Sequence, residues 1–228
     1  METSSVGIDK PLGYHSMPCI VPVILTAGDS SRMGYPKALL PLGGETFLTH
    51  ILSTLKAVEM PDARIVLGMH AAQIRPLLLG RPVRVLVNPD PARGQGSSMK
   101  LAAESLPPEC EGCLIWPVDH PLISEDLLRR LVRAFKESAA PLAMPCCGGR
   151  AGHPAIFGRE LIRELLAAHP GVNLKPLVSR YKAGAAWLTT DESGTVDDVD
   201  TPDDYFRLTG ETLESALSHL QRDNATDG

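Results

Sequence analysis

Residues 25–41 read Leu25-Thr-Ala-Gly28-Asp-Ser-Ser-Arg32-Met-Gly34-Tyr-Pro-Lys37-Ala-Leu-Leu-Pro41. The apolar run from Cys19 to Leu25 that leads into this stretch predicts a buried strand, and Phe47 to Val58 predicts a helix. A strand therefore runs into a loop of small residues that carries two cations, Arg32 and Lys37, before a helix begins.

This loop suits an anionic ligand. Gly28 and Gly34 let the backbone approach a ligand closely, and free N–H groups can point at phosphate oxygens. Arg32 can bind a phosphate in a bidentate manner, and Lys37 adds a compact positive charge. The loop is not a P-loop, because no Gly-Lys-Ser/Thr sequence closes it. Taken alone, the stretch is equally compatible with an ordinary strand-to-helix loop that holds two solvated cations.

Length and composition favour one soluble α/β domain. The chain has 228 residues, of which 43% are hydrophobic and 21% charged, with a net charge of −5. The acidic balance argues against a nucleic-acid surface, and no apolar run approaches the ~20 residues of a membrane span. Residues 1–18 lack an apolar signal core, so we expect a disordered leader there.

The cysteines favour a reducing compartment. Five cysteines, an odd number without framework spacing, argue against a disulfide scaffold, so we expect a cytoplasmic protein. Separately, we expect the protein to be a monomer or a weak dimer. Cys110 and Cys113 have the spacing of half a zinc site, but Cys146 and Cys147 are adjacent and would diverge in a strand. Small buried thiols are the favoured interpretation.

Strand and helix patterns alternate along most of the chain. Strands are expected at 63–67, 83–87, 112–118 and 141–146, and helices at 71–79 (broken by Pro76), 124–136, 159–168 and 173–181. This alternation predicts a mostly parallel sheet, whose ligands sit beyond the carboxyl ends of the strands. The loop at 26–37 lies at such an end. After residue 211 we expect one amphipathic helix and a disordered tail from Asn224.

Residues 88–99 also leave a strand and enter a helix. Gly94 and Gly96 open the backbone there, and Ser97 and Ser98 are expected to cap the helix and expose N–H groups. Such a segment can hold a nucleotide base with backbone groups and small hydroxyls. A helix N-cap without a ligand is the alternative.

Two acidic segments are candidates for metal binding. Asp119 directly follows an apolar strand, which places a carboxylate at the carboxyl edge near Arg32 and Lys37. A capping role for Asp119 is the alternative. Asp198 and Asp200 alternate with valines, which predicts a strand with both carboxylates on one face.

A glycine-rich segment from Gly148 to Gly158 predicts a hairpin or strand pair with glycine corners. Within it, His153 on local evidence is a structural, hydrogen-bonding histidine. Lys175, near the start of the expected helix at 173–181, is either a solvated residue or a contact for an acceptor phosphate.

Taken as a whole, the pattern Leu-x-Ala-Gly-x-Ser-x-Arg-Met-Gly-x-x-Lys-x-Leu-Leu-Pro at 25–41 resembles the opening signature of the sugar-nucleotide-type nucleotidyltransferases. Among these it is most similar to the molybdenum cofactor nucleotidyltransferases, and the resemblance runs from about Ile20 to Leu208. It implies a three-layer Rossmann-like α/β nucleotidyltransferase fold for residues 19–210. The implied nucleotide-binding residues are Leu25, Thr26, Ala27, Gly28, Ser30, Arg32, Lys37, Asn88, Gly94, Gly96, Ser97 and Ser98.

The resemblance extends to the chemistry. Asp119-His-Pro-Leu and the segment from Asp198 to Asp204 resemble the two metal motifs, which implies Mg²⁺ or Mn²⁺ on Asp119 and Asp200, with Asp198 as support. The implied catalytic residues are Arg32, Lys37 and Asp119. Gly-His-Pro at 152–154 resembles the cytidylyltransferase branch and implies an acceptor side formed by Arg150, His153 and Lys175. His120 departs from the pattern, because Gln or Met is more usual there.

The expected reaction is transfer of CMP from CTP to the phosphate of molybdenum-molybdopterin, with release of pyrophosphate, in a protein that serves a molybdoenzyme client. CTP is favoured over GTP because Ala27 stands where the guanylyl branch carries a second glycine. A guanylyltransferase and a sugar- or polyol-phosphate nucleotidyltransferase are alternatives within the enzyme class. A non-catalytic cofactor-binding chaperone is the alternative outside it, but a pure binder does not need Asp119.

Overall fold

Strand β1 (Cys19–Thr26) is central to the sheet because both of its faces are apolar. Ile24 packs into one hydrophobic cluster, and Val23 and Leu25 pack into the other on the opposite face. The computed structural model describes residues 19–226, with side chains as far as His219, so the leader expected at 1–18 and the last two residues lie outside the described part.

The main sheet has the order β10-β7-β9-β6-β1-β4-β5, with β8 paired to β7. Its other strands are β4 (Arg64–Leu67), β5 (Arg84–Val87), β6 (Cys110–Pro117), β7 (Leu142–Cys147), β8 (Arg150–Ala151), β9 (Ala155–Gly158) and β10 (Ala186–Thr189). The pairs β1–β4, β1–β6, β4–β5 and β7–β10 are parallel, whereas β9 is antiparallel to both of its neighbours. A separate small hairpin joins β2 (Pro41–Leu42) and β3 (Glu45–Thr46).

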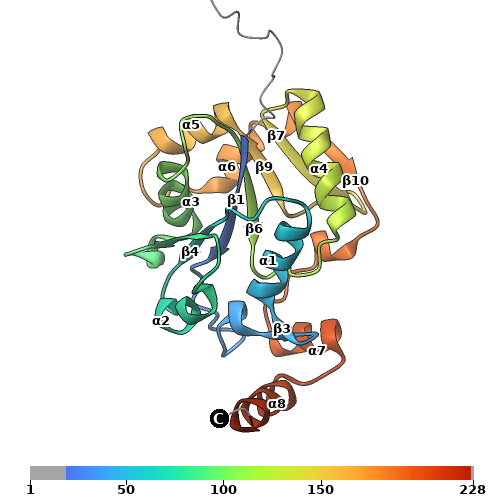
Figure 1. Ribbon diagram of the computed structural model, residues 1–228. Helices are drawn as coiled ribbons and strands as arrows, with labels where there is room; N and C mark the ends of the chain where they lie inside the picture. Colours follow the sequence, from blue (N-terminus) through green and yellow to red (C-terminus); the bar gives the residue numbers. More distant parts are fainter. Residues whose placement is uncertain (1–18, 227–228) are drawn as a thin grey trace, which may run out of the picture.

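Helices cover both faces of the sheet, as Figure 1 shows. One face carries α1 (Phe47–Ala57) and α4 (Glu125–Ser138), and the other carries α3 (Gln95–Glu104), α5 (Arg159–Ala167) and α6 (Leu174–Ser179). The expected three-layer α/β fold with a mostly parallel sheet is thus confirmed. Helices α7 (Pro202–Thr209) and α8 (Leu213–Thr226) lie together at one end of the molecule (Figure 1).

Several local expectations are wrong. The segment at 196–200 is not a strand: the Val199 N–H donates to the Asp119 carbonyl rather than to a ladder, and Asp198 is exposed. Ser97 and Ser98 do not cap a helix, because α3 begins at Gln95 with Gly94 as its N-cap.

Other differences concern the ends of elements. Pro76 shortens the expected helix at 71–79 to α2 (Ala71–Ile74), followed by the 3₁₀ helix η2 (Arg75–Leu78). The helix expected at 173–181 ends at Ser179, before the 3₁₀ helix η4 (Lys182–Gly184). Helix α8 continues to Thr226, past the expected start of a tail at Asn224.

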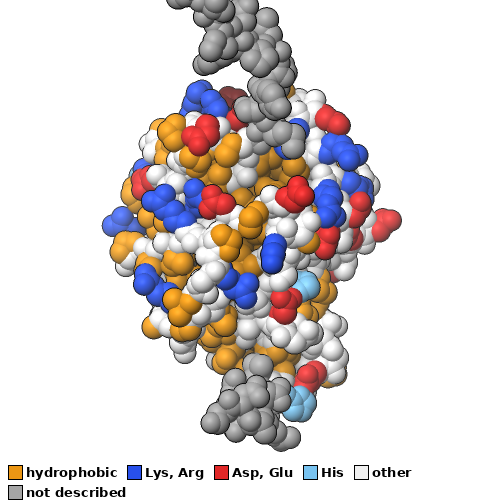
Figure 2. Space-filling model, in the orientation of Figure 1, with side chains coloured by type: hydrophobic (Ala, Val, Ile, Leu, Met, Phe, Trp, Pro, Cys, Tyr) orange, Lys and Arg blue, Asp and Glu red, His pale blue; other side chains and the backbone are white. Residues whose placement is uncertain are grey.

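The surface and interior agree with a globular chain. Figure 2 shows basic and acidic side chains interspersed over one face rather than gathered into a single basic field. Within residues 19–226, no helix is both long and apolar enough to cross a membrane. Cys110 and Cys113 are buried, and burial raises the pKa of each thiol.

Candidate active site

The loop after β1 holds its shape through contacts of its own. Ser30 and Gly34 have positive φ angles of 55° and 72°, and the Ser30 carbonyl accepts the N–H groups of Met33 and Gly34 at 3.1 and 3.0 Å. The Ser30 hydroxyl accepts the Lys37 N–H at 3.2 Å. Met33 is buried and anchors the loop in the core. A β-carbon at Gly28 would meet no protein atom within 4 Å, so the backbone there is open to a ligand.

Two carboxylates meet the two cations of this loop. Asp119 follows β6, and Asp200 directly precedes the N-cap of α7. The Lys37 Nζ lies 3.0 Å from Asp119 Oδ2 and also pairs with Asp200 Oδ1, while Arg32 Nη2 lies 2.6 Å from Asp200 Oδ2. The Lys37 side chain is 13% exposed and that of Arg32 is 69% exposed, so Lys37 forms the floor of the site and Arg32 its rim.

The charges in this group stabilise one another. Burial alone would lower the pKa of Lys37, but Asp119 and Asp200 outweigh it, and the pKa of the ammonium is raised. Burial would likewise raise the pKa of Asp200, yet its bonds to Lys37 and the nearby Arg32 lower it. Lys37 and Asp200 therefore both remain charged at neutral pH.

Backbone contacts hold Asp200 beside Asp119. The Val199 N–H donates to the Asp119 carbonyl at 2.9 Å, and the Asp200 N–H donates to the Asp204 carboxylate at 3.1 Å. Thr201 and Asp204 form a capping box at the start of α7. Asp204 is thus used for capping the helix and is not a free carboxylate of the cleft.

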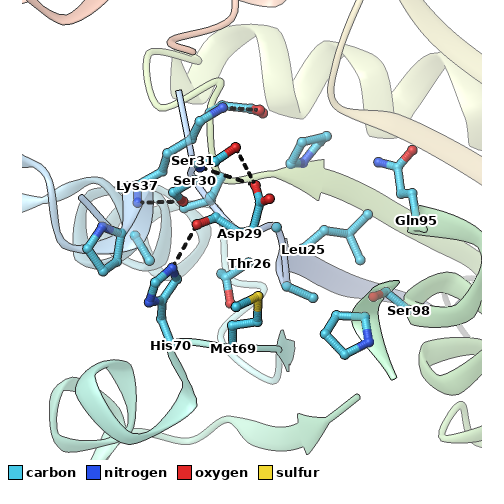
Figure 3. Close-up of a pocket in the computed structure, with 18 of the residues that line it drawn as sticks. Leu25, Thr26, Asp29, Ser30, Ser31, Lys37, Met69, His70, Gln95 and Ser98 are labelled. Atoms are coloured by element: carbon cyan, nitrogen blue, oxygen red, sulfur yellow. Dashed lines mark hydrogen bonds and ion pairs between the residues drawn. The ribbon is translucent and has the colours of Figure 1, made fainter. Parts of the chain in front are cut away.

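The loop after β1 lines a cleft of about 720 Å³ at the carboxyl edge of the sheet, together with Asp119 and Asp200 (Figure 3). Of the residues expected in the site, the cleft brings together Leu25, Thr26, Ala27, Gly28, Ser30, Arg32, Lys37, Gly94, Ser98, Asp119 and Asp200. Asn88 is buried behind the wall, where its amide donates to the hydroxyls of Ser97 and Ser98 at 2.8 and 2.9 Å. Gly96 also lies behind the wall, packed against the Val172 carbonyl.

The expected acceptor residues do not line this cleft. Arg150 donates to the Val196 carbonyl at 2.9 Å, on the loop that leads to Asp200. The His153 ring packs on the His120 ring with centroids 5.1 Å apart, and burial lowers the pKa of His153 to about 4. Lys175 lies on the exposed start of α6.

Sequence reasoning missed part of the cleft wall. Met69 and His70 follow β4 at the same sheet edge, and Figure 3 shows both beside the Asp29 loop. The His70 Nε2 lies 2.9 Å from the Asp29 carbonyl oxygen. Because both residues follow a predicted parallel strand, a place in the cleft wall could have been predicted for them from the sequence. Asp90 and Gln95 also line the cleft.

A parallel sheet whose first loop presents open backbone and two cations, with two carboxylates facing them, defines a nucleotide-binding α/β protein. Residues 22–185 match the family described as the MobA-like NTP transferase domain. Because this match covers most of the chain, the protein belongs to that nucleotidyltransferase family. The membership predicted from residues 25–41 is confirmed.

Individual relatives match more than half of the chain. The chain is 31% identical to nicotine blue oxidoreductase of Paenarthrobacter nicotinovorans over 86% of this chain and 100% of that protein. It is 38% identical to a probable molybdenum cofactor guanylyltransferase of Rhodopirellula baltica over 56% of this chain and 61% of that one. The crystal structure of Rv0371c from Mycobacterium tuberculosis superposes with a TM-score of 0.74 at 27% identity, covering 86% of this chain and 100% of that chain. That protein has also been solved in complex with manganese.

Proposed function

We propose that this protein is a divalent-metal-dependent nucleotidyltransferase that transfers CMP from CTP to the phosphate of molybdenum-molybdopterin, releasing pyrophosphate. The observation that carries the proposal is the arrangement of Lys37 and Arg32 against Asp119 and Asp200 at the end of an open phosphate loop. Family membership and the molybdenum cofactor relative support the substrate class. The same cation–carboxylate set favours phosphoryl chemistry over the redox activity named for the oxidoreductase relative.

The donor set fits a hard divalent cation. Asp119 and Asp200 supply carboxylate oxygens that face each other across one ammonium group. Among the described residues, no group of three or more His, Cys, Asp or Glu side chains gathers to hold an ion. Mg²⁺ commonly takes one or two protein carboxylates and completes its shell with phosphate oxygens and water. Such an ion, when bound, supplies neutralisation of the phosphate charge.

The residues of the chain provide positioning and charge. The acceptor phosphate is already ionised at neutral pH, so its oxygen can attack the α-phosphate in line without a protein base. In this proposal Lys37 neutralises charge at the α-phosphate, and the more exposed Arg32 neutralises the departing pyrophosphate. The cleft holds the nucleotide in a fixed orientation relative to the acceptor, and this positioning contributes to the rate of the reaction. The acceptor would approach from the side of Arg150 and His153, beyond the lining of the cleft.

The test is direct. Purified protein with Mg²⁺, each of the four nucleoside triphosphates and molybdenum cofactor is assayed for pyrophosphate, and we expect release that depends on the acceptor and is fastest with CTP. We expect Asp119→Asn to keep the fold and lose turnover, because one carboxylate charge is removed from the metal pair. Asp126→Asn, on the exposed face of α4, is the matched control. Normal pyrophosphate release by a folded Asp119→Asn variant would refute the metal assignment.

A further inference from the structure

His120 is adjacent to Asp119 in sequence but does not line the cleft. The residue is only 7% exposed. It contacts backbone groups, the Trp116 indole and the His153 ring. The Trp116 Nε1 donates to the His120 carbonyl at 2.8 Å, and the His120 N–H donates to the Pro117 carbonyl at 3.2 Å. These bonds close the turn that follows β6. His120 therefore stabilises this turn and does not form part of a substrate-binding surface.

The imidazole joins this turn to a distant segment. The His120 Nδ1 lies 3.1 Å from the carbonyl oxygen of Gly194, in the 3₁₀ helix η5 (Ser193–Thr195). A carbonyl oxygen only accepts hydrogen bonds, so Nδ1 carries the proton in this contact. One residue earlier in the turn, the Asp119 carbonyl accepts the Val199 N–H. Two consecutive residues of the turn therefore hold both ends of the segment at 194–199.

Packing leaves this segment little freedom to move. A β-carbon on Gly194 would lie 2.4 Å from the Leu122 carbonyl oxygen, so η5 is pressed against the turn after β6. On its other side, the His153 N–H donates to the Thr195 carbonyl at 2.7 Å. Asp200 follows directly after the clamped segment, so the position of η5 relative to the turn governs where its carboxylate lies.

We infer that His120 is a positioning residue: through its bond to the Gly194 carbonyl, it sets the separation of Asp119 and Asp200. The inference rests on the proposed function, in which this carboxylate pair holds the divalent cation. Hydrogen-bonding partners behind metal ligands are typically worth about 10–100-fold in metal affinity. His120 supports both ligands at once, because it follows one in sequence and its side chain fixes the segment that leads to the other.

Three substitutions separate the hydrogen bond from packing. His120→Phe keeps an aromatic ring against His153 but cannot donate to Gly194. His120→Asn loses the ring but retains an N–H donor at the same distance along the side chain, and His120→Ala loses both. The matched control is His169→Ala, because His169 is exposed and its Nδ1 contacts only the adjacent Pro170 carbonyl.

The measurement is Mn²⁺ affinity by calorimetry with a saturating non-hydrolysable CTP analogue, together with analogue affinity without metal and thermal stability. We expect His120→Phe and His120→Ala to bind Mn²⁺ about tenfold or more weakly, and His120→Asn to stay within about threefold of wild type. Analogue affinity without metal should change less than twofold in all variants.

The outcomes distinguish this inference from the proposed function. A folded His120→Phe protein that binds Mn²⁺ as tightly as wild type overturns the positioning role, as does a His120→Asn protein as weak as His120→Phe. If His120→Ala does not fold, the Mn²⁺ affinities of His120→Phe and His120→Asn are sufficient to test the positioning role. A wild-type protein that binds no Mn²⁺ overturns the metal assignment itself, and this inference with it.

Discussion

Ala27 lines the cleft at the point where β1 ends, and its backbone is held firmly in place. A β-carbon on Gly68 would lie 2.5 Å from the Ala27 carbonyl oxygen, so the ends of β1 and β4 are in close contact. Ala27 is largely buried and belongs to the core cluster that contains Val23 and Leu25. We expect its methyl group to leave less space for a base than a glycine would. A pyrimidine needs less of that space than a purine.

We predict that CTP is preferred over GTP by at least about tenfold in kcat/KM, which corresponds to ~1.4 kcal/mol of transition-state discrimination. We also predict that Ala27→Gly reduces this preference, because it removes the methyl group. The measurement is kcat/KM for both nucleotides on both proteins. Equal wild-type values would exclude the cytidylyl assignment. A preference retained in Ala27→Gly would place base selection elsewhere, with Gln95 to Ser98 as the next candidates.

His153 should make the fold sensitive to acid. Burial, aided by His120, lowers its pKa from 6.5 to about 4, and its buried Nδ1 has no hydrogen-bond partner within residues 19–226. The unfolded chain takes up a proton near pH 6.5, whereas the folded chain does so only near pH 4. Stability from this residue is therefore complete above pH 6.5 and is lost as the pH falls from 6.5 to 4.

We predict that this loss is on the order of 2 kcal/mol of unfolding free energy between pH 7 and 4.5. Urea unfolding at both pH values measures it for wild type, for His153→Gln and for His169→Gln, a control at an exposed histidine. The His153→Gln protein should lose less stability over this range than the other two. Identical pH profiles for all three proteins would show that His153 is protonated as readily in the folded chain as in the unfolded one.

At the scale of elements, the start of α3 depends on a glycine for its packing. A β-carbon on Gly96 would lie 2.0 Å from the Val172 carbonyl oxygen, and the backbone of neither segment can easily yield. Helix α3 carries Gln95 and Ser98 into the cleft, so a displacement here changes the cleft wall.

Gly96→Ala is expected to cost roughly 1–3 kcal/mol of stability and to raise KM for the nucleotide, because the added methyl group forces backbone to shift. Gly184→Ala is the matched control, since a β-carbon there meets nothing within 4 Å. Denaturant unfolding and nucleotide titration report the two effects separately. Equal stability of the two variants would show that the loop around Val172 can move away without cost.

The elements show why sequence reasoning succeeds in some places and fails in others. β1, its loop and the Asp119 position were predictable because each follows from a continuous local pattern, an apolar run ending in small or acidic residues. The strand β10 was missed, and it has a half-exposed, mixed pattern that differs little from a loop. The false strand at 196–200 rests on the short alternation Asp198-Val199-Asp200, and Val199 is bonded to the turn after β6 instead of to a neighbouring strand.

Contacts between distant segments set the remaining features of the site. The residues near Gly96 in sequence do not predict its contact with Val172. Likewise, those near His120 do not predict its hydrogen bond to Gly194. The placement of Asp200 beside Asp119 came from a family resemblance, because only the folded chain brings together residues so far apart in sequence.

The two cations and the two carboxylates form a group with no net charge. Lys37 and Arg32 occupy three of the four carboxylate oxygens of Asp119 and Asp200. A divalent cation that approaches this group meets an ammonium at the same oxygens. A triphosphate attracts both cations, and once they turn toward it the carboxylates are free to bind metal. Nucleotide and metal should therefore bind with positive coupling, and linkage requires the coupling to be reciprocal.

We predict that Mn²⁺ and a non-hydrolysable CTP analogue together raise Tm by more than the sum of their separate effects, because each ligand that binds only the folded state stabilises it according to its affinity. Lys37→Met should increase the Tm shift from Mn²⁺ alone, since the competing ammonium is gone, and should reduce the shift from the analogue alone. Lys56→Met, on the exposed face of α1, should behave as wild type. Strictly additive Tm shifts in wild type, or no gain in the Mn²⁺ response of Lys37→Met, would mean that Lys37 does not compete with metal for the two carboxylates. A lysine that competes in this way would delay metal binding until the triphosphate is in place, and the charged group would then assemble in one order, nucleotide first and metal second.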